Sequence, residues 1–284
     1  MKKSYRMIFV MLGSTSFILT LGLCFPVSMV AGILPPTGSF PLHIFLASFA
    51  AAIGASLLWI GFSGEPGTAV GGAIDLAVFY AGLTIYQLLS PQRDSQHLLV
   101  GVFLTLAAAA VSVGVFLRFR RFPIEDRRPT PLTLRVSFGV FVVVLLLVGG
   151  ALLLHIPNVF AWTLNPVSSA LVGCFFLGSA GYFLYGLLLP RWRNACGQLW
   201  SFLAYDLVLI VPYLLHAATV RPVQLPSFIV NGVILAYSAA LAIYYLLIKK
   251  ETRIILTRVR LFSPAKNIAR GGKLRTSPHH AHTR

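Results

Sequence analysis

Charged residues are scarce in this sequence, and acidic residues are the scarcest. Only 11% of the 284 residues are charged, and seven of them are aspartate or glutamate, whereas soluble domains usually contain about 25% charged residues. A mean hydropathy of +0.82 and 57% hydrophobic residues leave more apolar surface than a water-soluble fold of this length can bury. The composition therefore excludes an ordinary soluble domain.

Cysteine is also rare, with single residues at Cys24, Cys174 and Cys196. No pair forms a Cys-x-x-Cys pattern, and three widely spaced cysteines do not define a disulfide framework. His-x-x-x-His and His-Glu-x-x-His patterns are absent as well. We therefore expect free, buried thiols.

Long apolar runs dominate what remains, and each is near the ~20 residues that a helix needs to cross a bilayer. Short connections rich in Pro, Gly, Ser and Asn separate the runs. The sequence predicts an all-α integral membrane protein with about eight transmembrane helices, rather than a barrel. The expected spans are residues 7–29, 42–62, 70–89, 97–118, 136–155, 167–189, 198–218 and 228–249.

The basic residues give the expected orientation. If the N-terminus is cytoplasmic, all of the 23 basic residues except Arg93 and Arg221 lie on the cytoplasmic side. Because positive charge is retained on that side of a membrane, we expect both termini in the cytoplasm and location in the plasma membrane.

The two halves of the chain match at a constant shift of 131 residues. The rarer residues carry the match: Asp75 falls on Asp206, and prolines 26, 35 and 91 fall on prolines 157, 166 and 222. We interpret this as a tandem duplication, with both four-helix repeats in the same orientation. The predicted organisation is a first half at 1–119, a basic cytoplasmic linker at 120–135, a second half at 136–250 and a tail at 251–284.

The tail is predicted to begin as an amphipathic helical segment and to continue as a disordered basic segment. Each basic residue near an anionic leaflet contributes about 1 kcal/mol, so anionic lipid is its expected partner and nucleic acid is the weaker alternative. A second copy of the chain or another membrane protein is a further possible partner. The residues expected at lipid headgroups are Arg253, Arg258, Arg260, Arg191 and Arg193.

Two acids inside apolar runs are the main candidates for function. Asp206 and Asp75 each interrupt a predicted span, and a charged residue there costs at least ~2.5 kcal/mol. Burial disfavours the charged form of a carboxyl group, so these residues could gain and release a proton. Tyr213 shares the helical face of Asp206. The alternative is a structural hydrogen bond from Asp206 to Asn231 or Tyr237 of the next span.

Histidine and cysteine suggest a third possibility near the extracytoplasmic face. Imidazole and thiolate groups can bind zinc, copper or haem iron, although the expected cofactor is none. The candidates are Cys24, His43, His155 and Cys174.

Three functions therefore stay open. The leading hypothesis is a transporter that uses an intramembrane aspartate to couple a proton or cation. The second is a non-catalytic membrane subunit or scaffold, and the third is a membrane-embedded metal, haem or redox protein. An enzyme is the less favoured class.

Overall fold

The structure is a computed structural model that describes residues 3–25, 40–89, 95–219 and 225–252. The described residues form helices and contain no strand, which confirms the all-α prediction. Eight helices are long and apolar enough to cross a membrane, as the apolar runs predicted. The helices are α1 (Lys3–Cys24), α3 (Phe40–Ser63), α4 (Ala69–Leu89), α5 (Ser95–Phe119), α6 (Leu132–Leu153), α7 (Pro166–Leu188), α8 (Trp192–Thr219) and α9 (Leu225–Ile243).

Two short elements complete the described chain. A 3-10 turn, η1 (Pro66–Thr68), leads from α3 into α4. A π-helical segment, η2 (Tyr244–Ile248), extends α9. α8 continues as one helix across Pro212.

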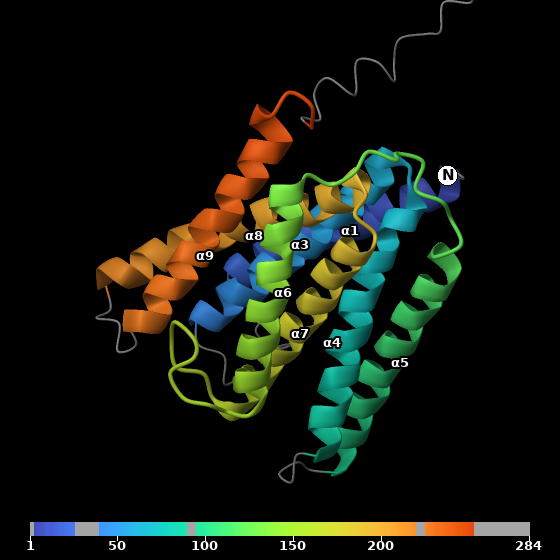
Figure 1. Cartoon of the computed structure of the whole chain (residues 1–284). Coiled ribbons are helices and arrows are strands. Elements are labelled where there is room, and N and C mark those ends of the chain that lie inside the picture. Colours follow the sequence, from blue (N-terminus) through green and yellow to red (C-terminus); the bar gives the residue numbers. More distant parts are fainter. Residues whose placement is uncertain (1–2, 26–39, 90–94, 220–224, 253–284) are drawn as a thin grey trace, which may run out of the picture.

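The helices pack in pairs around a central group of four (Figure 1). Within the first half, α1 packs on α3 and α4 packs on α5; within the second, α6 packs on α7 and α8 packs on α9. Contacts of α3 with α8 and of α4 with α7 join the halves. Helices α3, α4, α7 and α8 therefore form the centre of the bundle.

Small residues allow the outer helices to approach the central ones. A Cβ atom on Gly13 of α1 would lie 2.9 Å from the carbonyl oxygen of Gly54 in α3. In the second half, a Cβ atom on Gly149 of α6 would lie 3.0 Å from the carbonyl oxygen of Gly173 in α7. Such close crossings are typical of helices that associate without a hydrophobic driving force.

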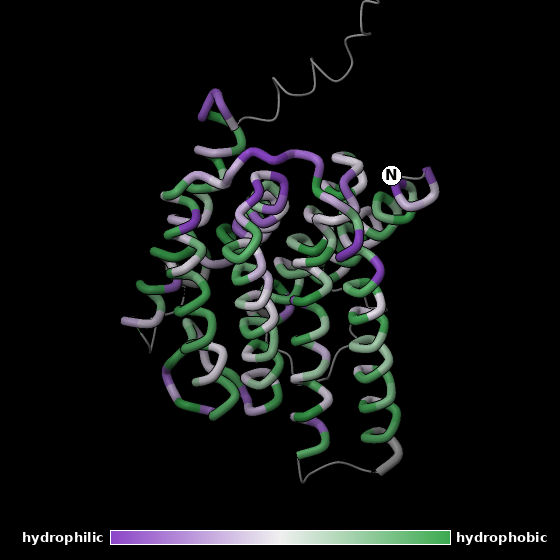
Figure 2. The backbone as a smooth tube through the Cα atoms, turned by 45° about the vertical axis from the view of Figure 1, so that its right-hand side comes forward, coloured by the Kyte–Doolittle hydropathy of each residue, from purple (hydrophilic) through white to green (hydrophobic). Residues whose placement is uncertain are grey.

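Polar residues gather at one end of the bundle (Figure 2). This basic end contains the start of α1 at Lys3, residues 120–131 of the predicted linker, which precede α6, the start of α8 and the end of η2 before Lys249. The linker is held there by its backbone, since the Trp192 amide donates to the Arg128 carbonyl over 2.9 Å. The opposite end carries the connection 154–165 between α6 and α7.

Candidate functional site

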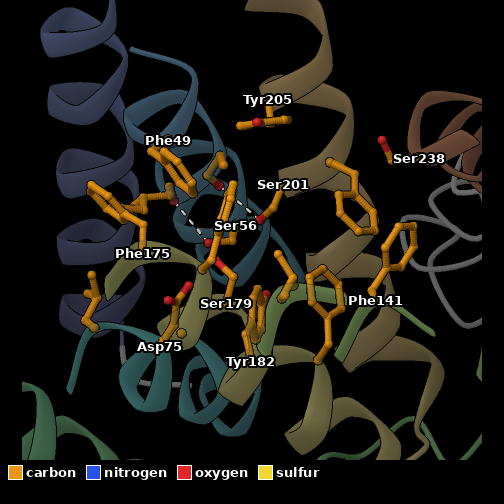
Figure 3. A pocket seen from close by; sticks show the side chains of 18 of the residues that line it. Phe49, Ser56, Asp75, Phe141, Phe175, Ser179, Tyr182, Ser201, Tyr205 and Ser238 are labelled. Atoms are coloured by element: carbon orange, nitrogen blue, oxygen red, sulfur yellow. Dashed lines mark hydrogen bonds between the residues drawn. The ribbon is translucent and has the colours of Figure 1, made fainter. Parts of the chain in front are cut away.

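A cavity of about 530 Å³ lies in the centre of the bundle (Figure 3). Residues from all four central helices line it, and α1, α5, α6, α9 and the segment 159–162 contribute further walls. Its lining is mainly apolar and aromatic, with hydroxyl groups distributed over it, one side-chain amide and one carboxylate. This volume and composition are typical of sites for small organic ligands.

Asp75 supplies the carboxylate. It lies on α4, is partly accessible, and lines the cavity. Its carboxylate packs against α7 at Gly178, where a Cβ atom would lie only 2.4 Å from Asp75 Oδ1 and 2.6 Å from the Asp75 carbonyl oxygen. A glycine at 178 is therefore required for the carboxylate to take this position.

Hydroxyl groups from three helices surround the same part of the cavity: Ser56 of α3, Ser179 and Tyr182 of α7, and Ser201 of α8 (Figure 3). The Tyr182 phenol interacts with the hydroxyls of Ser56 and Ser201, and also with the charge of Asp75. The site thus combines one acid with several neutral donors and acceptors.

Aromatic rings form the adjoining wall. Phe175 stacks between Phe49 and Phe79, with centroid distances of 4.3 and 3.9 Å. The rings come from α7, α3 and α4, so this stack joins both halves of the chain beside Asp75. Tyr205 of α8 meets Phe49 edge-on at 5.5 Å.

A second aromatic group lies toward the opposite end. Phe45 of α3 makes edge-on contacts with Phe160, Trp162 and Phe176 at 5.1, 6.1 and 5.9 Å. Phe160 and Trp162 belong to the connection between α6 and α7. We call Phe45, Phe160, Trp162 and Phe176 the aromatic cluster; it covers the cavity on this side.

Asp206 does not line the cavity. Its side chain is only 2% exposed, and Oδ1 accepts a hydrogen bond from the Ser238 hydroxyl of α9 over 3.0 Å. Oδ2 is buried without a hydrogen-bond partner among the described residues. The predicted hydrogen-bond partner of Asp206 on the next span is confirmed as to the helix but not as to the residue, which is Ser238. Of the two expected partners, Asn231 donates to the Ser227 carbonyl and Tyr237 pairs with Ser137.

Tyr213 lines the cavity and also ties α8 to α9. Its ring stacks on Phe228 at 4.2 Å, and its hydroxyl donates to the Phe228 carbonyl. A Cβ atom on Gly232 would lie 2.7 Å from that hydroxyl oxygen. The contacts of Tyr213 are thus with α9 rather than with Asp206.

Arg193 is the centre of an ion-pair network at the basic end. Its Nε lies 3.1 Å from Glu65 Oε1 and 3.3 Å from Asp126 Oδ2, and its side chain is 14% exposed. The guanidinium also lies over the Trp59 ring at 5.5 Å, and the Trp59 indole donates to the Arg193 carbonyl. Arg128 completes the network with a 2.7 Å contact to Asp126. These residues connect the first half, the linker and α8.

The two acids of this network respond differently to their surroundings. Burial raises the pKa of the Glu65 carboxyl above its ordinary value, and the charge of Arg193 acts against that rise. Burial also disfavours ionised Asp126, but the hydrogen bonds and charge of Arg128 lower the pKa of Asp126 below its ordinary value. Glu65 is therefore the acid that depends most on Arg193.

The expected lipid contacts fall into two groups. Arg193 faces carboxylates inside the protein, and Arg191 donates to the Ile124 carbonyl of the linker over 2.7 Å. Both arginines therefore hold the linker against the second half. Arg253, Arg258 and Arg260 lie outside the described residues.

The histidine and cysteine candidates do not form a common site in the part of the chain that the structure describes. Cys174 is buried in α7, Cys24 is half-buried at the end of α1, and His155 is exposed with a φ of 53°. His43 lies in α3. No group of three histidine, cysteine or acidic side chains suited to a metal occurs among the described residues.

Some of the site could be found from the sequence and some could not. Asp75 and Tyr213 were candidates and line the cavity; Ser179 was not a candidate, although it falls on Ser48 at the same shift of 131 residues. Tyr182 gave no signal, because a tyrosine inside an apolar helix is common.

Comparisons with protein-family models, with curated proteins and with solved structures find no match to this chain.

Proposed function

We propose that this chain is a multi-pass membrane transporter that binds its ligand in the central cavity, with Asp75 as the charged group of the site. The position of Asp75 carries the proposal: an acid lies in an apolar cavity where helices of both halves meet. Acids inside membrane spans are rare and mark ligand or ion pathways.

The distribution of charge supports insertion with the basic end in the cytoplasm. The linker, the start of α8 and both described chain ends lie at that end, and all the basic residues whose side chains are described belong to it. Reporter fusions truncated after Arg128 and after Arg193 should both read cytoplasmic. An external reading at either position would contradict this orientation in the plasma membrane.

The register of the central helices supports a tandem duplication. In the α4–α7 contact, Asp75 lies against Gly178. A forward shift of 131 residues carries Asp75 onto Asp206 of α8, and the same shift backward carries Gly178 onto Ala47 of α3. Five residues back from Asp206 is Ser201, and five residues forward from Ala47 is Ala52. In the α3–α8 contact the Ser201 hydroxyl donates to the Ala52 carbonyl over 3.0 Å. Both contacts thus have the register that one gapless shift requires.

A contact at the centre is also consistent with two-fold related halves. Phe45 and Phe176 occupy matching positions, and their rings lie 5.9 Å apart. A residue can touch its own counterpart only near the axis that relates them. The outer helices follow the shift less closely. The shift carries the crossing of Gly149 with Gly173 onto positions 18 and 42, whereas the first half has its crossing at Gly13 and Gly54.

Different groups hold the helices together at the two ends of the bundle, which suits alternating access. At the basic end, the Arg193 network joins Glu65 and Asp126 across the halves. At the opposite end, the aromatic cluster packs from α3, α7 and the connection between α6 and α7. Transport requires the contacts at the two ends to separate in turn, so that the cavity faces one side at a time.

A non-catalytic membrane subunit is the second candidate. Asp206 favours it, because this acid is sealed between α8 and α9 and serves as a tie between helices. In that case the cavity would stay closed to water on both sides.

Cysteine accessibility distinguishes these functions without knowledge of the substrate. Ser179 lines the cavity, whereas its counterpart in the first half, Ser48, is fully buried and does not. We would place a single cysteine at either position, Ser179→Cys or Ser48→Cys, in a chain whose three native cysteines are replaced by alanine. A charged, membrane-impermeant thiol reagent is then added to right-side-out or inverted vesicles.

A transporter should react at position 179 from both sides and at position 48 from neither. Reaction at 179 from one side only would refute transport and leave a ligand-binding protein. Lack of reaction from both sides would refute the proposal in favour of a packed subunit.

A further inference from the structure

The charges around the cavity determine which ligands it can hold. Among the described residues that line it, Asp75 is the one charged side chain, and there is no lysine, arginine or histidine. An anionic ligand would meet a carboxylate without a compensating cation. A buried charge of this kind is stable only with a partner of opposite sign or in its neutral form.

The geometry around Asp75 leaves space for a partner that the protein does not provide. Gly178 lets the carboxylate lie against α7, and the Ser179 and Tyr182 hydroxyl groups lie close to it (Figure 3), with no lysine, arginine or histidine among the described lining residues. An inorganic divalent cation would need about six oxygen ligands. Asp75 is the one carboxylate among the described lining residues, and the other polar groups of the lining are neutral, so such a cation would lack the anionic ligands that bind it best.

The remaining walls favour an apolar body. The cavity extends from the Phe49 and Phe175 rings to the wall between α1 and α5, where Leu12 and Val111 line it. Both of these side chains also reach the outer surface, with exposures of 51% and 67%. Aromatic rings add electron-rich faces that attract organic cations.

Given the proposed function, on which this inference rests, we propose that the ligand is a lipophilic organic cation, with its positive group beside Asp75 and its apolar body between the aromatic rings. One carboxylate selects a single positive charge. The hydroxyls of Ser179 and Tyr182 border the same region and accept hydrogen bonds from a protonated amine.

Tetraphenylphosphonium and tetraphenylborate provide a matched test, because they have the same shape and opposite charge. Binding is measured by equilibrium dialysis on the full chain in lipid nanodiscs, with empty nanodiscs to subtract partition into lipid. The wild-type chain should bind the phosphonium ion, and the borate ion should not compete.

Asp75→Asn should weaken phosphonium binding at least tenfold, or about 1.4 kcal/mol. Asp206→Asn is the matched control, since this acid lies outside the cavity and the amide oxygen can still accept from Ser238; it should bind within twofold of wild type. Equal binding by Asp75→Asn, or competition by the borate ion, would overturn the inference. The comparison of the two ions on the wild-type chain holds even if Asp75→Asn fails to fold.

The thiol assay separates this inference from the proposed function. Bound phosphonium should protect Ser179→Cys from the thiol reagent. If that cysteine reacts from both sides but the phosphonium ion neither binds nor protects it, transport stands and the organic cation is refuted. If the cysteine is unreactive from both sides, the proposed function itself is wrong.

Discussion

Replacing Arg193 by methionine should destabilise the protein strongly, because it removes the charge that faces two carboxylates at the basic end. Methionine keeps most of the side-chain volume and can still contact the Trp59 ring. The change therefore tests the charge of Arg193 rather than its packing.

The magnitude follows from burial. The side chains of Arg193, Glu65 and Asp126 are 14%, 9% and 12% exposed, so water screens the pairs little. Removing one partner of a buried ion pair costs roughly 3–5 kcal/mol. Asp126 retains Arg128, which places the expected loss near the lower value, about 3 kcal/mol. At roughly 2–4 °C per kcal/mol, the melting temperature should fall by about 6–12 °C.

The assay is thermal unfolding of the purified chain, followed by tryptophan fluorescence. Arg135→Met is the control, because Arg135 is an exposed arginine of α6, and its loss should change the free energy of unfolding by no more than about 0.5 kcal/mol. Adding Glu65→Gln to Arg193→Met should restore part of the loss, since the uncompensated acid is then gone.

The pH dependence gives a second criterion. Burial raises the pKa of Glu65 in the folded state. Protonated Glu65 therefore contributes to the free energy of unfolding at low pH, and this contribution is lost as the pH rises through the pKa of Glu65 in the folded protein. Without Arg193 that pKa rises further. The Arg193→Met defect should therefore be smaller at pH 5 than at pH 7.5, and the difference should vanish in the double variant. A defect of similar size at both pH values, or a melting temperature unchanged from wild type, would refute this explanation.

Two further predictions concern the aspartates. Gly178→Ala should lower the melting temperature and disturb the cavity, because the new Cβ would lie 2.4 Å from Asp75 Oδ1. The control is Gly72→Ala, whose Cβ meets nothing within 4 Å, and this change should be neutral or stabilising by up to about 1 kcal/mol. Equal effects of the two changes would contradict the contact between Gly178 and Asp75. Ser238→Ala should cost about 1–3 kcal/mol in the free energy of unfolding, because it leaves both oxygens of Asp206 without a donor. Adding Asp206→Leu should then recover stability, and a further loss instead would show that the carboxyl group has another partner.

Local sequence patterns were sufficient for the fold class but not for the environment of each polar residue. Apolar runs determine where helices form, so the eight helices could be predicted. The burial of Arg193 could not, because its partners Glu65 and Asp126 come from two other segments. Asp206 shows the same limit, since its hydrogen-bond donor lies 32 residues away on the next helix.

Glycine explains another part of what was missed. Gly178 has no side chain and gave no polar signal, yet the lack of a Cβ atom is what allows Asp75 to lie against α7. A search for acids, histidines and cysteines cannot detect a residue that acts by leaving space.

The different environments of Asp75 and Asp206 can be traced to two positions, if the halves arose by duplication. Gly178, which gives space to Asp75, corresponds in the other half to Ala47, a buried residue with a methyl group. Ser238, which donates to Asp206, corresponds to the exposed Ala107 of α5, which offers no hydroxyl to Asp75. One acid is thereby held between two helices, and the other is left to line the cavity. A duplicated pair in which one acid ties two helices and the other lines the cavity requires no more than these small changes in side-chain volume and hydrogen bonding.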